Sequence, residues 1–515
     1  MLFQKLLLKI FFTLFIGLLI ILYLNQLRVC RRYPVPSPPL IPILGHIIEL
    51  GSTAEAIHTN ILRLIDTYGK VIQLWIGPFD HYYFISDIDI TNKILSSTKL
   101  IEKSHAYDLL APWLGYGLLL SGGEKWHKRR KMLTPAFHFT ILEQSINTFT
   151  TASDIFVKNL KKHVDGGNFD VYPYITLLGL DIICQTAMGI DINAQMQSDS
   201  EYVTAVRDVC QIVFERIFSA IQQSDFIFYN FTKNGKVFKK SLKILHNLTN
   251  KVIEERRQLL IDSMKNNTTK PNKIINKEVI NDLEVQEKKE KMVFMDVLLK
   301  STIDGKPLTN SDIREEVDTF MFEGHDTVSS GLSFTLYLLA NHPEVQNQVF
   351  EEIREICGDD LKKHATLSDL NKMSYLEAVI KESMRIYPPV PIVGRKLSED
   401  LPLENGVLRK NARPSIMIYS IHHNPEYFPD PEAFKPERFL TQAQNKNYFS
   451  YIPFSAGSRN CIGQKFAMYE MKSTITNVIR HYELCSAGPE YELKLALAII
   501  LKATNGVNIK LKLRS

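Results

Sequence analysis

The chain has 515 residues, of which 45% are hydrophobic, and a formal net charge of +5. That length could hold about three average domains, but no Gly/Ser linker or proline-rich hinge divides the chain after residue 45, so we expect one large domain with a sizeable core. The net charge is small for this length, so it hardly argues for nucleic-acid binding, and contact with a membrane or an acidic partner would explain it as well. Six scattered cysteines without a C-x-x-C pair favour a reducing compartment.

The N-terminal segment, residues 1–30, is predicted to be a membrane anchor. Residues 10–27 carry no charge, and as a helix they would reach about 27 Å, nearly the thickness of the bilayer core. A cleaved signal peptide is the alternative, but the apolar run is long for one and no small-residue cleavage site follows it. Charge alone leaves the orientation open, because the two flanks are nearly balanced: Arg28, Arg31 and Arg32 against Lys5, Lys9 and the terminal amine.

The residues after the anchor predict a stiff spacer and then a hairpin. Residues 31–45 are rich in proline, which removes backbone donors and restricts the preceding residue, so we expect a hinge that orients the domain on the membrane. The main domain would then comprise residues 46–515. Within it, residues 71–76 and 82–85 flank Gly77-Pro78 and predict a hairpin at the edge of a small sheet.

A glycine-punctuated loop near the C-terminus delivers Cys461 to the start of a predicted helix. A thiolate there would be stabilised by unpaired backbone N–H groups and by the positive end of the helix dipole, and could hold a metal. Gly457 and Gly463 allow tight turns and the close approach of a flat ligand, Phe454 can cover the sulfur, and Arg459 can pair with an anionic edge. The alternative is a buried structural cysteine.

This loop resembles the haem-binding signature of the cytochrome P-450 superfamily, F-x-x-G-x-R-x-C-x-G, with every fixed position present. The resemblance implies that Cys461 is the axial ligand of haem b (iron protoporphyrin IX) and that Phe454, Arg459 and Gly463 contact this group. It extends from the anchor to about residue 485. It therefore implies the superfamily's fold, which is mainly α with a small β-sheet subdomain near the N-terminus, carried on an N-terminal transmembrane anchor.

A second informative block spans residues 107–137. Trp126 and Arg130 lie four residues apart, on one helix face, so an indole N–H and a guanidinium can reach the same carboxylate. Taken alone, such a pair is more often ordinary packing and surface. The block resembles family 4 of the superfamily, and in the superfamily this W-x-x-x-R helix binds a haem propionate.

A long helix of about 30 residues is predicted to cross the whole domain, over about 45 Å. Thr309 and Asp312 form a plausible capping box at its start. Gly324 in its interior is unfavourable, which suggests that something approaches the backbone there. Asp326 and Thr327 are poor helix formers, so the helix should be locally weak. The alternative is a solvent-exposed acidic face.

This part of the helix resembles the superfamily's oxygen-activation motif. The resemblance implies that the helix opens beside the haem, and that Asp326 and Thr327 deliver protons to the distal oxygen. It also implies that Gly324 lies against the haem pocket. Glu323 matches the glutamate that family 4 members often esterify to a haem methyl group. Val328 departs from the Thr or Ser common at its position, without affecting the hydroxyl assigned to proton transfer.

Glu382 and Arg385, three residues apart on a helix, would alone be a surface pair of little energetic weight. They resemble the superfamily's E-x-x-R motif, which is completed by an arginine from P-E-R-F, here Arg438. We expect one buried network that assembles the haem pocket without taking part in the chemistry. Arg395 matches a position that usually binds a propionate, and a surface arginine is its alternative.

Two further segments have weaker readings. The aromatic residues 226–231, followed by lysines, either rest on the bilayer surface beside a substrate entrance or are core aromatics next to a solvated loop. Residues 264–291 are rich in Lys, Asn and Glu, which predicts a polar connector.

Together the resemblances imply a membrane-bound haem-thiolate monooxygenase that inserts one oxygen atom from O₂ into a lipophilic substrate. No dinucleotide fingerprint or flavin site is visible, so the electrons need a separate protein. The family resemblance implies that this protein is NADPH-cytochrome P-450 reductase, with a cytochrome b-type donor as a second candidate. Docking is expected on the cysteine side, through Lys465, Lys472 and Arg480. The family places the catalytic domain on the cytosolic face of the endoplasmic reticulum, the source of microsomal membrane.

The substrate stays open between fatty-acid omega-hydroxylation and the oxidation of hormones, hydrocarbons or xenobiotics. Two other functions would use the same fold. An isomerase or lyase would rearrange peroxides without a reductase, although such enzymes often lose the acid–Thr pair that this chain keeps. A non-catalytic haem-binding membrane protein would bind haem without oxidising a substrate.

Overall fold

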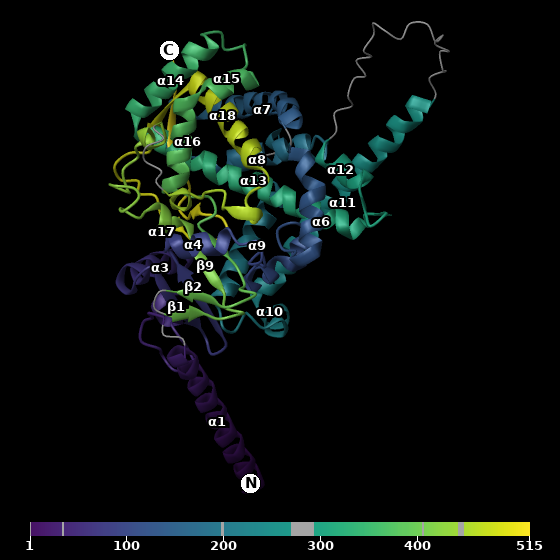
Figure 1. Ribbon diagram of the computed structural model, residues 1–515. Helices are drawn as coiled ribbons and strands as arrows, with labels where there is room; N and C mark the ends of the chain where they lie inside the picture. Colours follow the sequence, from purple (N-terminus) through teal and green to yellow (C-terminus); the bar gives the residue numbers. More distant parts are fainter. Residues whose placement is uncertain are drawn as a thin grey trace.

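The computed structural model describes residues 2–32, 35–137, 139–196, 200–268, 293–403, 406–440 and 447–514. Helices dominate, and several small sheets lie among them (Figure 1). The predicted class, mainly α with small sheets, is confirmed. Residues 269–291 of the predicted polar connector lie outside the described residues, while its start belongs to helix α11 (Lys233–Thr268).

The first helix, α1 (Leu2–Arg32), projects from the rest of the molecule (Figure 1). Among the described residues it is the one helix long and apolar enough to cross a membrane, with a mean hydropathy of 2.6. Its last turns lie against the domain. Gln26 is fully buried, donates to Gly77 O and accepts from Ile43 N, both at 3.0 Å. The predicted span therefore ends in contact with protein, where the hinge meets the first hairpin.

The largest sheet has the strand order β1-β2-β9-β6. Strands β1 (Val71–Ile76) and β2 (Asp80–Ile85) form the predicted antiparallel hairpin, with β1 at the edge. Strands β9 (Pro414–Met417) and β6 (Ile392–Gly394) complete the sheet from more than 300 residues later in the chain. The predicted N-terminal sheet thus ties the two ends of the domain together.

Helix α13 (Asn310–Asn341) crosses the middle of the domain (Figure 1). The Thr309 hydroxyl accepts from Asp312 N at 3.1 Å, and the Asp312 carboxylate accepts from Thr309 N at 3.0 Å, so the predicted capping box is confirmed. Helices α8 (Tyr172–Ile183), α16 (Ser374–Ile386) and α18 (Gln464–His481) pack around it. Because other helices surround α13, its side chains point into the interior of the protein on more than one side of the helix.

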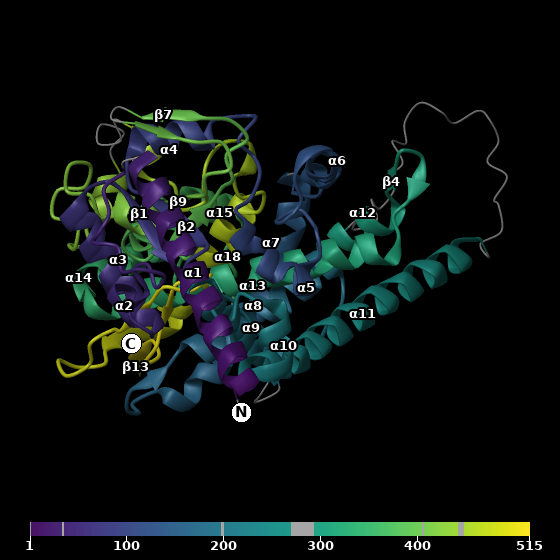
Figure 2. The same cartoon turned by 90° about the horizontal axis from the view of Figure 1, so that it is seen from below.

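Helix α10 (Asp225–Phe231) follows α9 (Glu201–Ile217) in the chain and packs against α11, at the end of the domain from which α1 projects (Figures 1 and 2). Phe226 and Phe231 are 70% and 72% exposed, whereas Phe228 is fully buried beneath the guanidinium of Arg216. Phe228 therefore belongs to the core, as one of the two readings predicted. Phe226 and Phe231 are exposed on a helix at the anchor's end of the domain, and the bilayer contact of the other reading stays a prediction.

The remaining elements complete the domain. The helices are α2 (Ile47–Leu50), α3 (Ala54–Tyr68), α4 (Ile88–Leu95), α5 (Ala111–Leu114), α6 (Gly123–Leu133), α7 (Phe139–Leu160), α12 (Phe294–Lys300), α14 (Pro343–Cys357), α15 (Leu367–Lys372) and α17 (Ile418–His422). The strands are β3 (Phe169–Asp170), β4 (Thr302–Ile303), β5 (Lys306–Pro307), β7 (Leu401–Leu403), β8 (Gly406–Leu408), β10 (Tyr482–Ser486), β11 (Leu495–Ala496), β12 (Lys502–Ala503) and β13 (Asn508–Leu513).

Candidate functional site

A cavity of about 330 Å³ lies between helix α13 and the loop that carries Cys461. Most of the site residues predicted from the sequence line it, although they come from three distant parts of the chain. These lining residues are Trp126, Arg130, Glu323, Gly324, Thr327, Phe454, Arg459, Cys461 and Gly463. Asp326 and Arg395 are the two predicted site residues that do not line the cavity.

The cysteine loop is held in place by backbone contacts. Gly457 has φ +69°, and a Cβ there would collide with the carbonyl oxygen of Leu95, so only glycine fits. Cys461 N donates to Phe454 O at 2.9 Å. Helix α18 begins three residues after Cys461, as the sequence predicted.

The Cys461 side chain is exposed to this internal cavity rather than to bulk solvent. Burial raises the pKa of its thiol to about 12, and the charge of Glu323 adds to this, while the backbone N–H of Gly463 and the charge of Arg130 lower it. The predicted help from the helix terminus is therefore present, but burial outweighs it. A thiolate in this position needs a cation bound to the sulfur, because a coordinating metal ion deprotonates a thiol outright.

The opposite wall of the cavity is the middle of α13. Thr327 Oγ1 lines the cavity and donates to Glu323 O at 2.7 Å. The helix is continuous through this stretch, so the predicted opening of the helix is not found. A Cβ on Gly324 would lie 2.5 Å from the Ile183 side chain of α8. What approaches the backbone at Gly324 is thus a neighbouring helix, which also supports α13 and keeps it regular.

Asp326 lies on a different face of α13 from Thr327. Its carboxylate accepts from Tyr172 OH at 2.8 Å and lies 3.3 Å from Lys502 Nζ. Burial alone would raise the pKa of this carboxyl, but Lys502, His325 and Tyr172 together hold it below its usual value. The predicted acid–alcohol pair is therefore split: the alcohol faces the cavity, and the acid is ionised behind the helix.

Trp126 and Arg130 lie on α6, and both reach the cavity. Arg130 donates to Asn460 O at 2.9 Å and to Asn460 Oδ1 at 2.8 Å, which attaches α6 to the cysteine loop. The guanidinium of Arg459 lies over the Trp126 ring, 4.7 Å from its centroid. The two predicted residues and the signature arginine therefore form one cationic corner of the cavity.

Positive charge also gathers beside this corner. Burial, and then the charge of Arg395, lower the pKa of Arg459 to about 10. Arg395 is 2% exposed, stands behind the cavity wall and donates to Gly394 O at 3.1 Å. Lys103 pairs with Arg395 in an isolated β-bridge and lines the cavity, and burial and both guanidinium groups lower its pKa well below the usual value. Sequence reasoning missed Lys103, because nothing in its neighbourhood separates it from other lysines.

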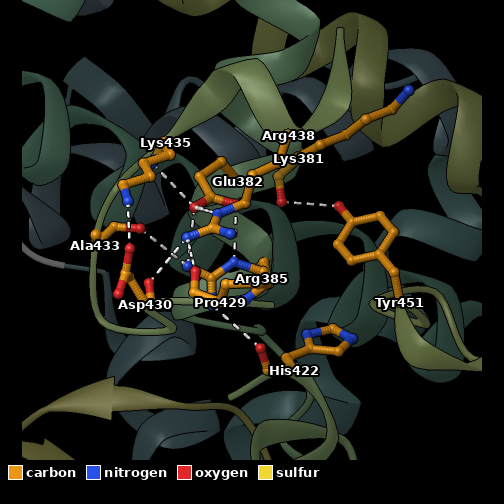
Figure 3. Close-up of polar contacts among 10 residues, drawn as sticks. All are labelled: Lys381, Glu382, Arg385, His422, Pro429, Asp430, Ala433, Lys435, Arg438 and Tyr451. Atoms are coloured by element: carbon orange, nitrogen blue, oxygen red, sulfur yellow. Dashed lines mark hydrogen bonds and ion pairs between the residues drawn. The ribbon is translucent and has the colours of Figure 1, made fainter. Parts of the chain in front are cut away.

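The predicted E-x-x-R network is confirmed (Figure 3). Glu382 and Arg385 are fully buried and joined by two hydrogen bonds of 2.8 Å, and Arg438 Nε donates to the same carboxylate at 3.2 Å. Arg385 also donates to His422 O at 3.1 Å, and His422 Nε2 accepts from Ile452 N at 2.9 Å. The network thereby fixes the backbone that leads into the cysteine loop.

Two of the three cations predicted to dock an electron donor are buried in the structure. Lys472 is 2% exposed and donates to Leu370 O and to Glu377, both within 2.9 Å. Arg480 is 7% exposed and donates to backbone carbonyls such as Lys363 O, at 2.7 Å. Their predicted docking role is therefore wrong, because both side chains are hydrogen-bonded inside the protein and cannot contact a partner. Lys465 is exposed at the start of α18.

The residues around the cavity fit a haem group. A sulfur ligand stands on one side, and a Cβ added at Gly463 would meet no protein atom closer than 4.0 Å, so a flat ring can approach the backbone there. Four cations gather around the cavity, namely Arg395, which is buried, and Lys103, Arg130 and Arg459, which are half-buried. Burial lowers the pKa of each, and a bound group with two carboxylates would neutralise them. No group of three or more His, Cys, Asp or Glu side chains that could hold a metal ion occurs among the described residues.

Comparisons with known proteins agree with this geometry. The cytochrome P450 family model matches residues 35–509. Cytochrome P450 4d2 of Drosophila melanogaster is 43% identical over 484 residues, covering 93% of this chain and 94% of the relative. Human cytochrome P450 4V2 is 42% identical over 491 residues, covering 94% and 90%. These matches imply haem held by a cysteine thiolate, a redox partner, a lipophilic substrate and a membrane anchor. The chain belongs to the cytochrome P450 family and is a haem monooxygenase.

Proposed function

We propose that this monooxygenase hydroxylates long apolar chains at or near their terminal carbon, with fatty acids as the substrate class. Support comes from the aliphatic and aromatic side chains that line the cavity, which come from three separate parts of the chain. They include Phe84 of the sheet, Val213, Phe214 and Ile217 of α9, and Ile499 and Ile500 before β12. Such walls bind an extended hydrocarbon by burying its surface, at about 25 cal/mol per Å².

In this proposal, the cysteine sulfur binds the iron of haem b, and the cations bind its propionates. Cys461 is the axial ligand in this proposal, and Phe454 and Gly463 contact the ring. Arg130, Arg395 and Arg459, with Trp126 and Lys103, would hold the propionates at the cationic corner, where charge-assisted hydrogen bonds are strong. This is supported by the absence of a carboxylate hydrogen-bonded to any of these four cations in the described part of the chain.

Haem bound through a thiolate supplies the reductive cleavage of dioxygen, which consumes two electrons and two protons. In our proposal the protein delivers the protons. Thr327 Oγ1, on the cavity wall, holds the last proton, and Asp326 supplies it from behind the helix. Replacing Thr327 by Ala should divert electrons from product into peroxide, measured as product and peroxide formed per NADPH. Unchanged coupling in Thr327→Ala would contradict the role of the hydroxyl.

Glu323 faces the cavity, and burial raises the pKa of its carboxyl while Lys103 and Arg459 lower it. We propose that a Glu323 oxygen forms an ester with a haem methyl group. A C–O bond replaces a C–H bond, and the dioxygen-derived oxidant of turnover takes up the two electrons. Acidic organic solvent should then leave haem on the wild-type chain and extract it from Glu323→Ala. Complete extraction from the wild-type enzyme after turnover would rule out the ester.

Electrons are proposed to come from NADPH-cytochrome P-450 reductase, with a cytochrome b-type donor as a second source. Lys465 is the predicted docking cation that the structure leaves exposed. We also propose the anchor, hinge and catalytic divisions 1–30, 31–45 and 46–515, with the domain on the cytosolic face of the endoplasmic reticulum. The exposed rings of Phe226 and Phe231, on the side of α1, support contact with that membrane.

The experiment that tests the substrate class is turnover of a panel of fatty acids, terpenoid hormones and xenobiotics with reductase, with the position of oxidation read by mass spectrometry. The proposal predicts that fatty acids turn over fastest and are oxidised at the terminal carbon. Preferred oxidation of a ring-containing terpenoid would contradict it. Product formed from a peroxide without NADPH or reductase would indicate an isomerase, which nothing in the site favours.

A further inference from the structure

Behind α13, on the side away from the cavity, lies a set of buried polar groups that the site described above does not use. Four side chains there are at most 3% exposed: Asp318, Tyr202, His325 and Asp326. Among the described residues, Asp318 Oδ2, Tyr202 OH and His325 Nε2 have no hydrogen-bond partner, whereas Asp326 Oδ2 is ion-paired with Lys502 Nζ at 3.3 Å. Buried polar atoms are nearly always satisfied by protein or by ordered water. A cluster of this kind is therefore a site for internal water, which typically binds two to four polar partners.

The outer end of the cluster is Asp318, two turns before the site on α13. Its Oδ1 accepts from Thr249 Oγ1 at 2.5 Å. Its Oδ2 lies 3.8 Å from His246 Nε2 and 3.9 Å from Arg314 Nε, whose side chains are 22% and 38% exposed. Burial raises the pKa of Asp318 to about 8, against opposing contributions from Thr249 and Arg314. At neutral pH this carboxyl holds a proton within reach of solvent.

The middle of the cluster is His325 and Tyr202. His325 Nδ1 lies 2.7 Å from Met321 O, and because a carbonyl only accepts, Nδ1 carries the proton and Nε2 is left as an acceptor. Burial lowers the pKa of His325, so the ring is neutral. The Tyr202 ring lies 5.9 Å from it. Burial and then the charges of Asp318, Cys184 and Asp326 raise the pKa of Tyr202 well above its usual value, so its hydroxyl keeps its proton at neutral pH.

The inner end is Asp326, ionised between Tyr172 and Lys502. Lys502 comes from β12, its side chain is 18% exposed, and it neutralises the carboxylate without removing its ability to accept a proton. Asp318 and Asp326 are eight residues apart, which is about 12 Å along the helix. A few hydrogen bonds of about 2.8 Å each span that distance.

We propose that Asp318, Tyr202 and His325 are positioning residues of a water-filled path that carries protons from the surface beside His246 to Asp326. The proposal rests on the proposed role of Asp326 as proton source. Asp318 releases its carboxyl proton inwards and takes another from solvent, while each bridging group accepts one proton and passes one on. The net change is one proton moved inwards per passage, with no electrons exchanged, and two passages supply one turnover.

The test uses the full-length enzyme in lipid bilayers with reductase, and compares Tyr202→Phe and Asp318→Asn with a control, Tyr482→Phe. The control also removes one buried hydroxyl, which donates to Val157 O far from the cluster. We expect product per NADPH to fall roughly tenfold in the two path variants, less than the loss of a general acid itself. In the same two variants, the solvent isotope effect on product formation should increase. The control should match the wild type in both.

A second readout needs no turnover. The infrared spectrum at pH 7 should contain the carbonyl band of a protonated, buried carboxyl that disappears in Asp318→Asn. If water joins the two groups, the same band shifts in Tyr202→Phe. Wild-type coupling and isotope effect in both path variants, or a carboxyl band unaffected by Tyr202→Phe, would overturn the path.

The variant Asp326→Asn distinguishes the proposed proton path from the proposed role of Asp326 as proton source. If Asp326→Asn loses coupling while Tyr202→Phe and Asp318→Asn keep it, Asp326 remains the proton source and the path is wrong. If Asp326→Asn stays coupled, the proton role of Asp326 fails first. Should Asp318→Asn not fold, Tyr202→Phe alone decides, because it removes only one oxygen atom.

Discussion

Two regions of this molecule bury arginine in opposite ways. In the scaffold, Arg385 and Arg438 share the carboxylate of Glu382, so their charges are compensated within the protein (Figure 3). At the cavity, the guanidinium of Arg459 donates to three backbone carbonyls and lies over the Trp126 ring, and within the described residues no carboxylate is hydrogen-bonded to it. A buried charge with an internal partner holds a fold together, whereas one without such a partner is suited to an anionic ligand. The comparison explains why one region is a scaffold and the other a binding site.

Removing the shared carboxylate should have the largest effect. Glu382→Ala leaves two buried guanidinium groups uncompensated, and we expect it to lower the free energy of unfolding by about 3–5 kcal/mol. The yield of haem-loaded protein should fall with it. Glu437→Ala is the matched control in the same segment, because Glu437 is exposed and its loss should change stability by less than about 0.5 kcal/mol. Equal effects of the two variants would contradict the scaffold role.

The next largest effect is a pH dependence of the free energy of unfolding, caused by the buried carboxyl of Glu470. Glu470 on α18 is fully buried, and neither of its oxygens has a hydrogen-bond partner in the part of the chain that the structure describes. Burial raises its pKa well above 4.5. The folded state therefore keeps a proton that the unfolded chain loses above pH 4.5. This contribution to stability is fully present below pH 4.5 and is lost as pH rises towards the folded pKa, at about 1.4 kcal/mol per pH unit.

The variant Glu470→Gln removes this titration. Denaturant unfolding should find the two proteins separated by a constant amount below pH 4.5, and Glu470→Gln should gain on the wild type at each higher pH. A difference that does not change between pH 4 and pH 8 would mean that Glu470 has an ionic partner in solution.

The smallest effect is expected at the cavity, where replacing Lys103 tests whether its charge serves haem binding or the stability of the fold. Lys103→Met removes a half-buried cation that has no internal carboxylate bonded to it, so we expect the haem-free protein to become more stable, by about 1–2 kcal/mol. Haem affinity should fall about tenfold, which corresponds to about 1.4 kcal/mol. Haem titration and unfolding of the haem-free protein measure both. Lys99→Met, at an exposed lysine of the same segment, should change neither. A less stable haem-free protein with unchanged haem affinity would make Lys103 part of the scaffold.

Several local features of the fold could be predicted from the sequence. The hairpin at Gly77, the cap formed by Thr309 and Asp312, and the start of α18 after Cys461 each depend on a few neighbouring residues, whose spacing is visible in the chain. The cysteine loop belongs with them, since Gly457 is needed for its own backbone conformation.

The rest depends on partners far away in the sequence. Asp326 turns away from the cavity because Lys502, 176 positions later, pairs with it. Lys472 is buried because Leu370 and Glu377 offer acceptors about a hundred residues earlier. The side chain that fills the space beside Gly324 comes from α8, so α13 stays regular where its sequence indicates weakness. Helical periodicity contains none of these contacts.

The account depends most on Cys461 binding haem iron through an ionised sulfur. The most direct measurement is the absorption spectrum of freshly purified, haem-loaded enzyme, reduced and exposed to carbon monoxide. We predict the strongly red-shifted Soret band of a thiolate-ligated iron carbonyl in the wild type, and its loss in a Cys461→His variant that still retains haem. Haem-loaded wild type without the shifted band, or a Cys461→His variant that keeps it, would contradict the assignment.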